Sequence, residues 1–390
     1  MGSSRREFLQ AVTCASLLPV SFGVLAKGPV PRYLVLVELK GGNDGLNTLA
    51  PYESDDYRKL RPMIGLRKND VIHLENSASV GSLGLPLSMS PLTDSIGQDL
   101  ALIQGLGYPN QNRSHFKSIA LWETGGDGNR SQNTGWLTQS IEKLYGTGGI
   151  SAHGASFAGS TRLFSKGRGI YVSMARLNQM ASVENKASAR SSNKLMNLIA
   201  KRKRELVIAS QSLVGQLQNF SDRMIPRRMP HGSFSSQLSD VLRVIGAEIP
   251  LPVLHIQHGS FDTHEGQPWR HPRLLKELSE GLSRLRYNLR AMNRWQDVLV
   301  MTYSEFGRRA AENGAEGTDH GTASVHFMLG GRVNPGLYGQ YPAIDDLEDG
   351  DLKFTKDYRA VYEQVCRHWL RDGASPWSMF ADDQLEGLIG

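Results

Sequence analysis

Four acidic side chains stand where chemistry is expected, each after a β-rich run or inside a glycine-flanked turn. They are Asp44, Asp262, Glu305 and Asp319. If the runs are parallel strands of one sheet, their carboxyl ends share an edge, so these carboxylates gather there. Carboxylates crowded into one crevice repel one another unless some are protonated or cations lie between them. A metal centre at that edge resolves the repulsion most simply.

Two histidines accompany these acids. His264 follows Asp262 by two residues, and His320 follows Asp319 directly. Carboxylates with neutral imidazoles suit Zn²⁺ or Mn²⁺, whereas carboxylates with few histidines suit Mg²⁺ or Ca²⁺. The sequence leaves open the identity of the metal and whether one ion or two bind. Taken singly, each acid also has an alternative as a helix cap or turn residue.

The tripeptide Arg113-Ser114-His115 is the third chemically capable feature, at the expected start of a helix. A serine placed there near a metal ion becomes a nucleophile when the cation and the helix dipole lower the pKa of its hydroxyl. The alternative is that Ser114 or Asn112 only caps the helix. Arg113 and His115 are candidates for binding an anionic group, with Arg308 a further candidate for oxyanion recognition.

The elements that must position these residues alternate between strands and helices. Buried strands are expected at Tyr33–Leu39, at 252–257 and at 298–303, each followed by a polar turn, with a further strand-like run at 100–104. Helical patterns occupy about 114–124, 134–145, 192–220, 235–247, 271–294 and 357–371. This alternation predicts an α/β fold with a mostly parallel central sheet and helices on both faces.

One region departs from the regular pattern. Residues 146–190 are rich in Gly, Ser and Ala with weak periodicity, which indicates irregular surface structure or an inserted subdomain within about 146–230. The helix expected after it carries the basic run Lys201-Arg202-Lys203-Arg204. That run is interpreted as a solvated helix face, with an anion- or membrane-surface patch as the alternative.

The N-terminus has the layout of a twin-arginine signal peptide. Arg5 and Arg6 precede a stretch without further charge from Phe8 to Leu25, and a cut near Lys27 would remove residues 1–26. The mature domain then spans 27–390 and is expected in the periplasm, or otherwise outside the cytoplasm, with the twin-arginine translocase as its export partner. An ordinary amphipathic N-terminal helix is the alternative.

Composition limits the remaining function classes. Of the two cysteines only Cys366 would stay in the mature chain, so no internal disulfide, thiolate zinc site or iron–sulfur cluster is expected. The formal net charge of +6 weakly favours anionic ligands. Nucleic acid is not expected as a partner of an exported protein, and no later segment is long and apolar enough to span a membrane.

Six ordered motifs resemble the bacterial twin-arginine-exported "domain of unknown function 1501" family. The resemblance runs from about residue 33 to 371, on the motifs Gly41–Thr48, Arg113–Phe116, Thr134–Leu137, Phe261–His264, Ser304–Arg308 and Gly317–Gly321. That family is similar to the alkaline phosphatase and sulfatase superfamily. The resemblance implies a central sheet that holds one or two divalent metal ions, together with a Ser, Thr or Cys nucleophile.

Carried over by position, the resemblance assigns roles to the residues already singled out. It implies Asp44, Asp262, His264, Glu305 and His320, with Asp319, as metal ligands, and it places Ser114 near the nucleophile region. The superfamily often has Asp-His where this chain has Glu305-Phe306, which removes one imidazole and puts a complete two-zinc centre in doubt.

These observations favour a metal-dependent hydrolase that acts on a small anionic phosphate or sulfate ester, with Ser114 or water as the nucleophile. The alternative is a non-catalytic binding or assembly protein of the cell envelope that keeps the fold and a metal. An exported redox protein fits the export route, but the chain lacks the cysteines and a dinucleotide-binding fingerprint.

Overall fold

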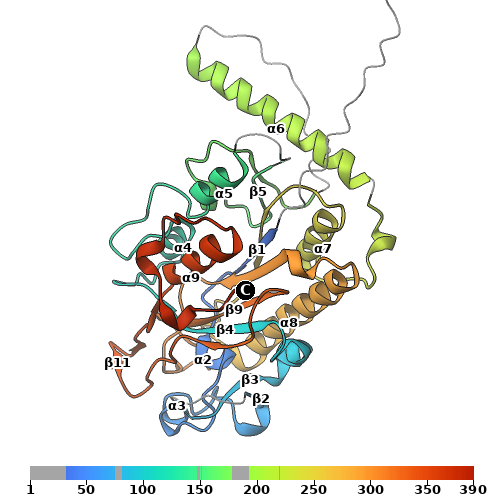
Figure 1. Cartoon of the computed structure of the whole chain (residues 1–390). Coiled ribbons are helices and arrows are strands. Elements are labelled where there is room, and N and C mark those ends of the chain that lie inside the picture. Colours follow the sequence, from blue (N-terminus) through green and yellow to red (C-terminus); the bar gives the residue numbers. More distant parts are fainter. Residues whose placement is uncertain (1–31, 75–80, 147–149, 151, 178–192, 219) are drawn as a thin grey trace, which may run out of the picture. The chain divides into compact units, whose positions relative to one another are not determined.

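The structure is a computed structural model that describes residues 32–74, 81–146, 150, 152–177, 193–218 and 220–390. Chain contacts divide the protein into Met1–Val30 and Pro31–Gly390. The unit Pro31–Gly390 holds all of the described residues (Figure 1). The twin-arginine signal expected at 1–26 lies outside the described residues.

A nine-stranded sheet forms the centre of the domain. The strand order is β10-β4-β9-β8-β1-β7-β5-β6, with β13 also paired to β4. The strands are β1 Tyr33–Leu39, β4 Leu100–Gly107, β5 Gly154–Ser156, β6 Tyr171–Ser173, β7 Val253–His258, β8 Val298–Tyr303, β9 Ser324–Gly330, β10 Gly336–Tyr338 and β13 Lys356–Asp357. In this sheet every recorded pairing is parallel except the two that β9 makes, with β4 and β8. The mostly parallel α/β sheet expected from the sequence is confirmed.

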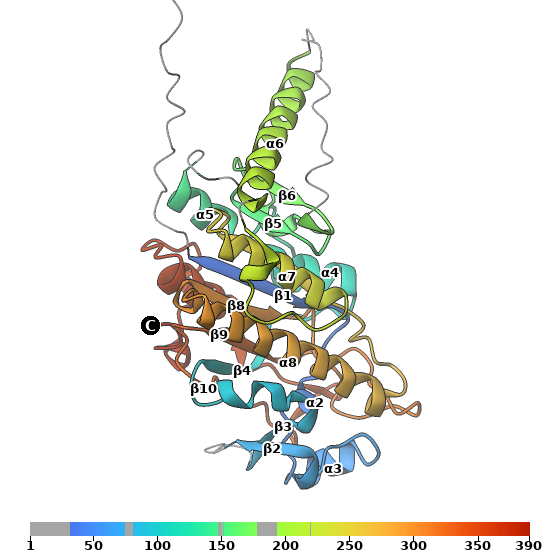
Figure 2. The same ribbon diagram turned by 90° about the vertical axis from the view of Figure 1, so that its right-hand side faces the viewer.

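Helices cover both faces of this sheet, as Figures 1 and 2 show. Leu34 and Leu36 of β1 belong to the core cluster that also holds side chains of the helices on one face, α4 His115–Thr124, α5 Thr138–Tyr145 and α9 Arg359–Gln364. Val35 and Val37 are equally buried. Because side chains alternate along a strand, they point to the other face. That face carries α7 Ser233–Gly246 and α8 Gln267–Ala291, which pack on each other.

Smaller elements surround the sheet. The helices α2 and α3 follow β1, strands β2 and β3 form an antiparallel pair, and β11 and β12 form another. Their bounds are α2 Gly45–Thr48, α3 Asp55–Leu60, β2 Val71–Leu74, β3 Leu83–Pro86, β11 Leu347–Glu348 and β12 Asp351–Leu352. The long helix α6 spans Lys194–Gln218. No helix among the described residues is both long and apolar enough to cross a membrane.

Two parts of the sheet differ from the sequence expectation. The stretch 146–190, expected to be irregular or inserted, contributes β5 and β6 to the sheet. These strands have only three residues each, so they exist through pairing with β7 and with each other rather than through a hydrophobic pattern. The antiparallel strand β9 was not expected either, although it lies between β4 and β8.

Candidate metal centre

Three side chains converge at the carboxyl edge of the sheet. They are His115, Asp262 and His320, each of which offers one donor atom within 4.8 Å of the others'. His115 opens α4 after β4, Asp262 lies in the loop after β7, and His320 lies just before β9. Since β9 runs opposite to its neighbours, its start lies at the edge where the parallel strands end. The topology therefore brings residues from three distant segments together.

Two glycines let the loops of this edge approach closely. Gly41 has φ +118°, and a β-carbon there would lie 2.4 Å from the backbone nitrogen of Asp262. A β-carbon on Gly317 would lie 2.2 Å from the carbonyl of His264. Real side chains do not fit at such distances, so the glycines fix how near the turn after β1 and the 317–321 loop come to the loop that carries Asp262.

Each of three histidines has its Nδ1 atom on a fixed partner. His115 Nδ1 lies 2.7 Å from Glu305 Oε1, and His264 Nδ1 lies 2.8 Å from Asp319 Oδ1. His320 Nδ1 lies 2.8 Å from the backbone carbonyl oxygen of Arg113. A carboxylate or carbonyl partner on Nδ1 is the arrangement that orients metal-binding histidines, because it leaves Nε2 for the ion.

The Nε2 atoms of all three rings face Asp262. The distances are 3.0 Å from His264 and 3.3 Å from His320 to Oδ1, and 3.6 Å from His115 to Oδ2. The Nε2 atoms of His264 and His320 lie only 3.0 Å apart. His264 thus joins the three-residue group as a fourth side chain, and the four are called the carboxyl-edge cluster below.

The hydrogen bond of His320 fixes what its Nε2 can be. A carbonyl oxygen only accepts, so Nδ1 of His320 carries the proton, and in the neutral ring Nε2 is a lone pair. That lone pair faces a carboxylate oxygen, a repulsive contact unless a proton or a cation lies between the two atoms. Burial lowers the pKa of His320, with a contribution from the positive charge of Arg308. The neutral ring is therefore favoured, and its Nε2 acceptor requires a proton or a cation between it and the oxygen of Asp262.

Asp262 stays ionised because Arg308 holds one of its oxygens. Burial alone would raise the pKa of Asp262, but the hydrogen bond and charge of Arg308 bring that pKa below its usual value. The Arg308 guanidinium lies 2.6 Å from Oδ1. It also donates to the carbonyl oxygens of Gly41, Gly42, Phe261 and Thr318. Arg308, considered above for oxyanion recognition, is committed to these partners.

Glu305 supports the cluster from behind. It was expected as a metal ligand, yet its side chain is only 2% exposed and accepts from the backbone nitrogen of Gly41 (2.8 Å) and from His115. The hydrogen bond to Glu305 raises the pKa of His115 against the opposing effect of burial. Glu305 is placed to orient His115, and it is not part of the three-residue group.

Asp44, which was expected as a metal ligand, lies outside the carboxyl-edge cluster. Its side chain is 1% exposed and makes an ion pair with the buried Arg61, at 2.6 Å and 3.0 Å from its two oxygens. Gln267 donates to the same carboxylate. Burial would raise the pKa of Asp44, and the charge and hydrogen bonds of Arg61 turn the shift downward. The positive charge that balances Asp44 is therefore that of Arg61, a residue outside the motifs identified in the sequence.

The remaining expected site residues lie beside the cluster. The guanidinium of Arg113, expected to bind an anion, is paired with Asp351 of β12. Ser114 is half-buried at the N-cap of α4, and its hydroxyl makes no capping hydrogen bond. Asp319 reaches the cluster only through His264. His115, expected to bind an anion, stands instead among the potential metal donors.

An apolar ring backs two of the histidines. The centroid of the Phe306 ring lies 4.9 Å from that of His115 and 4.6 Å from that of His320. This is the position where the resemblance drew attention to a missing histidine. The aromatic ring restricts how the two imidazoles can turn, which helps to hold their Nε2 atoms on Asp262.

Comparison with known proteins gives a family. The family model described as "Protein of unknown function (DUF1501)" matches residues 100–351, more than half of the chain. The chain belongs to this family. The matched part includes every residue of the carboxyl-edge cluster, whereas the Gly41–Thr48 motif lies before it. A search of curated proteins found no match.

Solved structures with a similar overall architecture have low sequence identity to this DUF1501 chain. The lipoteichoic acid synthase LtaP from Listeria monocytogenes has 11% identity and a TM-score of 0.34, over 84% of this chain and 75% of its own. The 2-O GAG sulfatase BT1596 has 11% identity and a TM-score of 0.37, over 78% and 65%. An alkaline phosphatase superfamily protein from Vibrio parahaemolyticus has 12% identity and a TM-score of 0.32, over 82% and 65%.

Proposed function

We propose that the carboxyl-edge cluster of His115, Asp262, His264 and His320 binds one divalent metal ion, zinc, and that the protein hydrolyses a phosphate or sulfate ester there. The observation that supports this best is the convergence of three Nε2 atoms on one ionised carboxylate. Three imidazoles and one carboxylate form a donor set that suits zinc better than Mg²⁺ or Ca²⁺. Glu305, Asp319 and the carbonyl oxygen of Arg113 would orient the three rings.

A bound zinc ion would supply Lewis acidity to the ester and lower the pKa of a water molecule. The chain's own groups would do the rest. The uncapped start of α4 offers backbone N–H groups and the positive end of a ten-residue helix beside His115, which favours an anionic substrate group there. The Ser114 hydroxyl, which makes no capping bond, is the protein nucleophile that we propose, with water as the alternative.

One observation favours a second function, a metal-containing binding or assembly protein without turnover. The two arginines expected to hold the substrate oxyanion are engaged, Arg113 by Asp351 and Arg308 by carbonyl oxygens and Asp262. The Arg308 guanidinium is fully buried, whereas the Arg113 side chain is 39% exposed and pairs with Asp351 through Nη2. An ester hydrolase at this site must then hold its anion through the metal, the α4 amides and the remaining N–H groups of Arg113.

Metal analysis and turnover measured together separate the two functions. The mature chain, equilibrated with zinc and desalted, is assayed with aryl phosphate and aryl sulfate esters beside the variants H320A and S114A. We expect one zinc per chain and measurable hydrolysis, both lost in H320A, with hydrolysis alone lost in S114A. The control H231A removes an exposed histidine away from the cluster and should change neither. Zinc without turnover on either ester would establish the binding function, and absence of zinc would overturn both.

Export is proposed on the N-terminal motif. Replacing Arg5 and Arg6 by lysine in a full-length reporter fusion should retain the protein in the cytoplasm, because the paired arginines form the transport signal. Unchanged export of that variant would exclude the twin-arginine route.

A further inference from the structure

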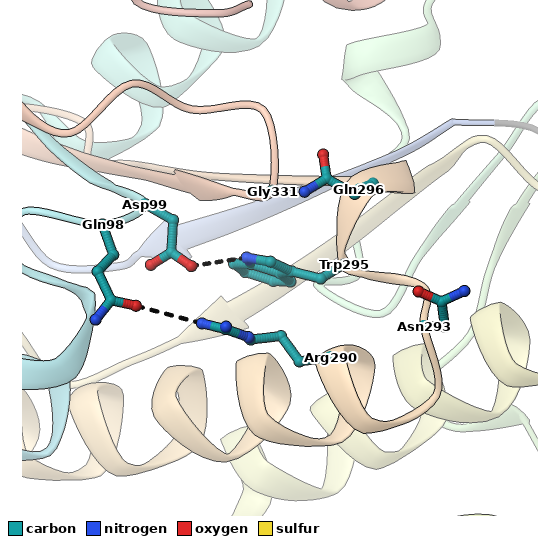
Figure 3. A pocket seen from close by; sticks show the side chains of 7 residues that line it. All are labelled: Gln98, Asp99, Arg290, Asn293, Trp295, Gln296 and Gly331. Carbon is teal, nitrogen blue, oxygen red and sulfur yellow. Dashed lines mark hydrogen bonds between the residues drawn. The ribbon is translucent and has the colours of Figure 1, made fainter.

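A second polar cavity lies at the opposite, amino edge of the sheet. Asp99 immediately precedes β4, and Trp295 belongs to the short helical turn Trp295–Asp297 that leads into β8. Gly331 directly follows β9, which runs the other way. Together with Arg290 near the end of α8, these residues line a partly open cavity of about 340 Å³ (Figure 3). That volume is at the lower end of the roughly 300–1,000 Å³ found for small-molecule sites.

The floor of this amino-edge pocket is built from buried, fully paired groups. Asp99 accepts from Nε of Arg286 at 2.8 Å and 2.7 Å through its two oxygens, and from Trp295 Nε1 at 2.8 Å. All three side chains belong to residues less than 9% exposed. The charge of Asp99 is thus balanced by Arg286, and its oxygens are already used. Asp99 does not compete for a ligand cation and does not repel a ligand anion strongly.

Gln98 is clamped so that its amide NH₂ group faces away from the floor. Its Oε1 accepts from Arg286 Nη2 at 2.7 Å and from Arg290 Nη1 at 3.3 Å (Figure 3). Guanidinium groups only donate, so the oxygen of Gln98 must face both arginines, and the NH₂ group remains for another acceptor. The side chain is fixed at both contacts, which removes much of the entropy cost of binding through it.

Arg290 carries a positive charge that no acidic side chain of the pocket balances, because Asp99 is already paired with Arg286. This exposed guanidinium has Gln98 as its recorded partner among the described residues, so most of its N–H groups are available. Two exposed residues with amide side chains, Asn293 and Gln296, also line the pocket and offer both donors and acceptors. The pocket therefore presents one unbalanced positive charge surrounded by groups that bind hydroxyls.

We propose that the amino-edge pocket binds a small hydroxylated anion, of the class of a sugar that carries a carboxylate or phosphate group. Arg290, whose guanidinium is hydrogen-bonded to the oxygen of Gln98, would bind the oxyanion, and the amides of Asn293 and Gln296 would bind hydroxyls. The cavity is larger than a bare phosphate requires and matches a monosaccharide in scale. Because it lies at the edge opposite the carboxyl-edge cluster, it is a second site, independent of whether that cluster hydrolyses esters.

Calorimetric titration of the mature, zinc-equilibrated chain, and of H320A in which the carboxyl-edge cluster is disabled, tests this assignment with four probes: glucose 6-phosphate, glucuronate, inorganic phosphate and glucose. Binding at the amino-edge pocket should be the same in both proteins. We expect the two sugar anions to bind with a Kd of about 1 mM or tighter. Glucose and inorganic phosphate should each bind at least about tenfold more weakly, since each lacks one half of the recognised chemistry. Equal affinity for inorganic phosphate and glucose 6-phosphate would remove the hydroxylated part of the proposal, and no binding of either sugar anion at millimolar concentration would overturn all of it.

Variants locate the binding. Q98E keeps the size of the side chain and its contacts to both arginines but replaces the free NH₂ group by an anionic oxygen, so anion binding should fall at least about tenfold. R290Q should weaken the sugar anions by a similar factor and leave glucose unchanged. The matched control R273Q removes an exposed arginine of the same helix that does not line the pocket. Equal losses in R290Q and R273Q would show a general charge effect and overturn the site.

Discussion

Two acids at the same edge of the sheet have opposite surroundings. Asp44 follows β1 and is sealed, 1% exposed, with both carboxylate oxygens on Arg61. Asp262 follows β7 and is 45% exposed, with Arg308 on one oxygen and three histidine Nε2 atoms around the pair. The first is a complete ion pair, and the second is an incomplete one beside three imidazoles. Completeness of pairing, rather than position at a strand end, separates the structural acid from the proposed ligand.

The largest expected effect comes from breaking the complete pair. R61M leaves the buried carboxylate of Asp44 without its cation, which should lower the free energy of unfolding by about 3–5 kcal/mol. Urea denaturation of the mature chain measures it. R58M, which removes an exposed arginine paired with Asp55, should cost at most about 1 kcal/mol. The double variant D44N/R61M should recover part of the loss, and a cost for R61M as small as that of R58M would contradict the structural role.

Breaking the incomplete pair should act on metal rather than on stability. In D262N, Arg308 keeps its carbonyl partners, so the free energy of unfolding of the metal-free protein should fall by less than about 2 kcal/mol. Zinc affinity should fall at least about 100-fold, because an anionic donor is lost from the centre of the cluster. Competition with a chromogenic chelator measures the affinity. A large loss of stability with unchanged zinc affinity would show that Asp262, like Asp44, is a structural acid.

His326, a buried histidine outside the carboxyl-edge cluster, should make the stability of the fold depend on pH. Within the described part of the chain, neither ring nitrogen of His326 has a hydrogen-bond partner, and burial lowers the pKa of this histidine to about 3. The folded state therefore keeps this ring neutral, while the unfolded chain takes up a proton below about pH 6.5. Because the unfolded chain then binds one more proton than the folded chain, the free energy of unfolding is highest above pH 6.5 and decreases as the pH falls from 6.5 towards 3.

The variant H326F removes that proton uptake. Between pH 7 and pH 5 its free energy of unfolding should rise relative to the wild type by about 2 kcal/mol. Denaturation curves at the two pH values measure it, and the exposed-site control H231F should track the wild type. A constant difference between H326F and the wild type at both pH values would show that His326 is not held neutral.

The smallest effect is expected for Glu305, whose side chain is hydrogen-bonded to His115. E305Q keeps an oxygen that accepts from Gly41 and His115 but loses the negative charge that raises the pKa of His115. Zinc affinity should fall about tenfold, at the lower end of the roughly 10–100-fold range for such supporting residues. A loss as large as that of D262N would make Glu305 a direct ligand, as the sequence suggested.

The fold was largely predictable because two of its central strands are nearly uninterrupted apolar runs. β1 and β8 are hydrophobic almost throughout, as strands buried on both faces are expected to be, whereas β7 also carries two histidines and a glutamine. The bounds of all three strands match the expected runs to within one residue. β5, with the sequence Gly-Ala-Ser, offers no such signal and depends on its neighbour β7. The sequence also contains nothing local that reveals the reversed direction of β9.

The proximity of some site residues was predictable, but their partners were not. Spacing and chemistry pointed to Asp262, His264 and His320, which the structure brings together, and their role as metal donors stays a prediction. What separated Asp44 from them was Arg61, a partner seventeen residues along the chain that no motif marks. The roles of Glu305 and Arg308 depended in the same way on which atom each side chain reaches, and that is set by tertiary packing.

The most direct measurement is X-ray absorption at the zinc edge on the mature protein after equilibration with zinc and desalting. We expect one zinc per chain, bound by three imidazole nitrogens and a carboxylate oxygen at about 2.0–2.2 Å, and no zinc retained by H320A after the same treatment. Failure to retain zinc, or a first shell of oxygen atoms without imidazole, would contradict the central claim that the three histidines converge on Asp262 to hold an ion.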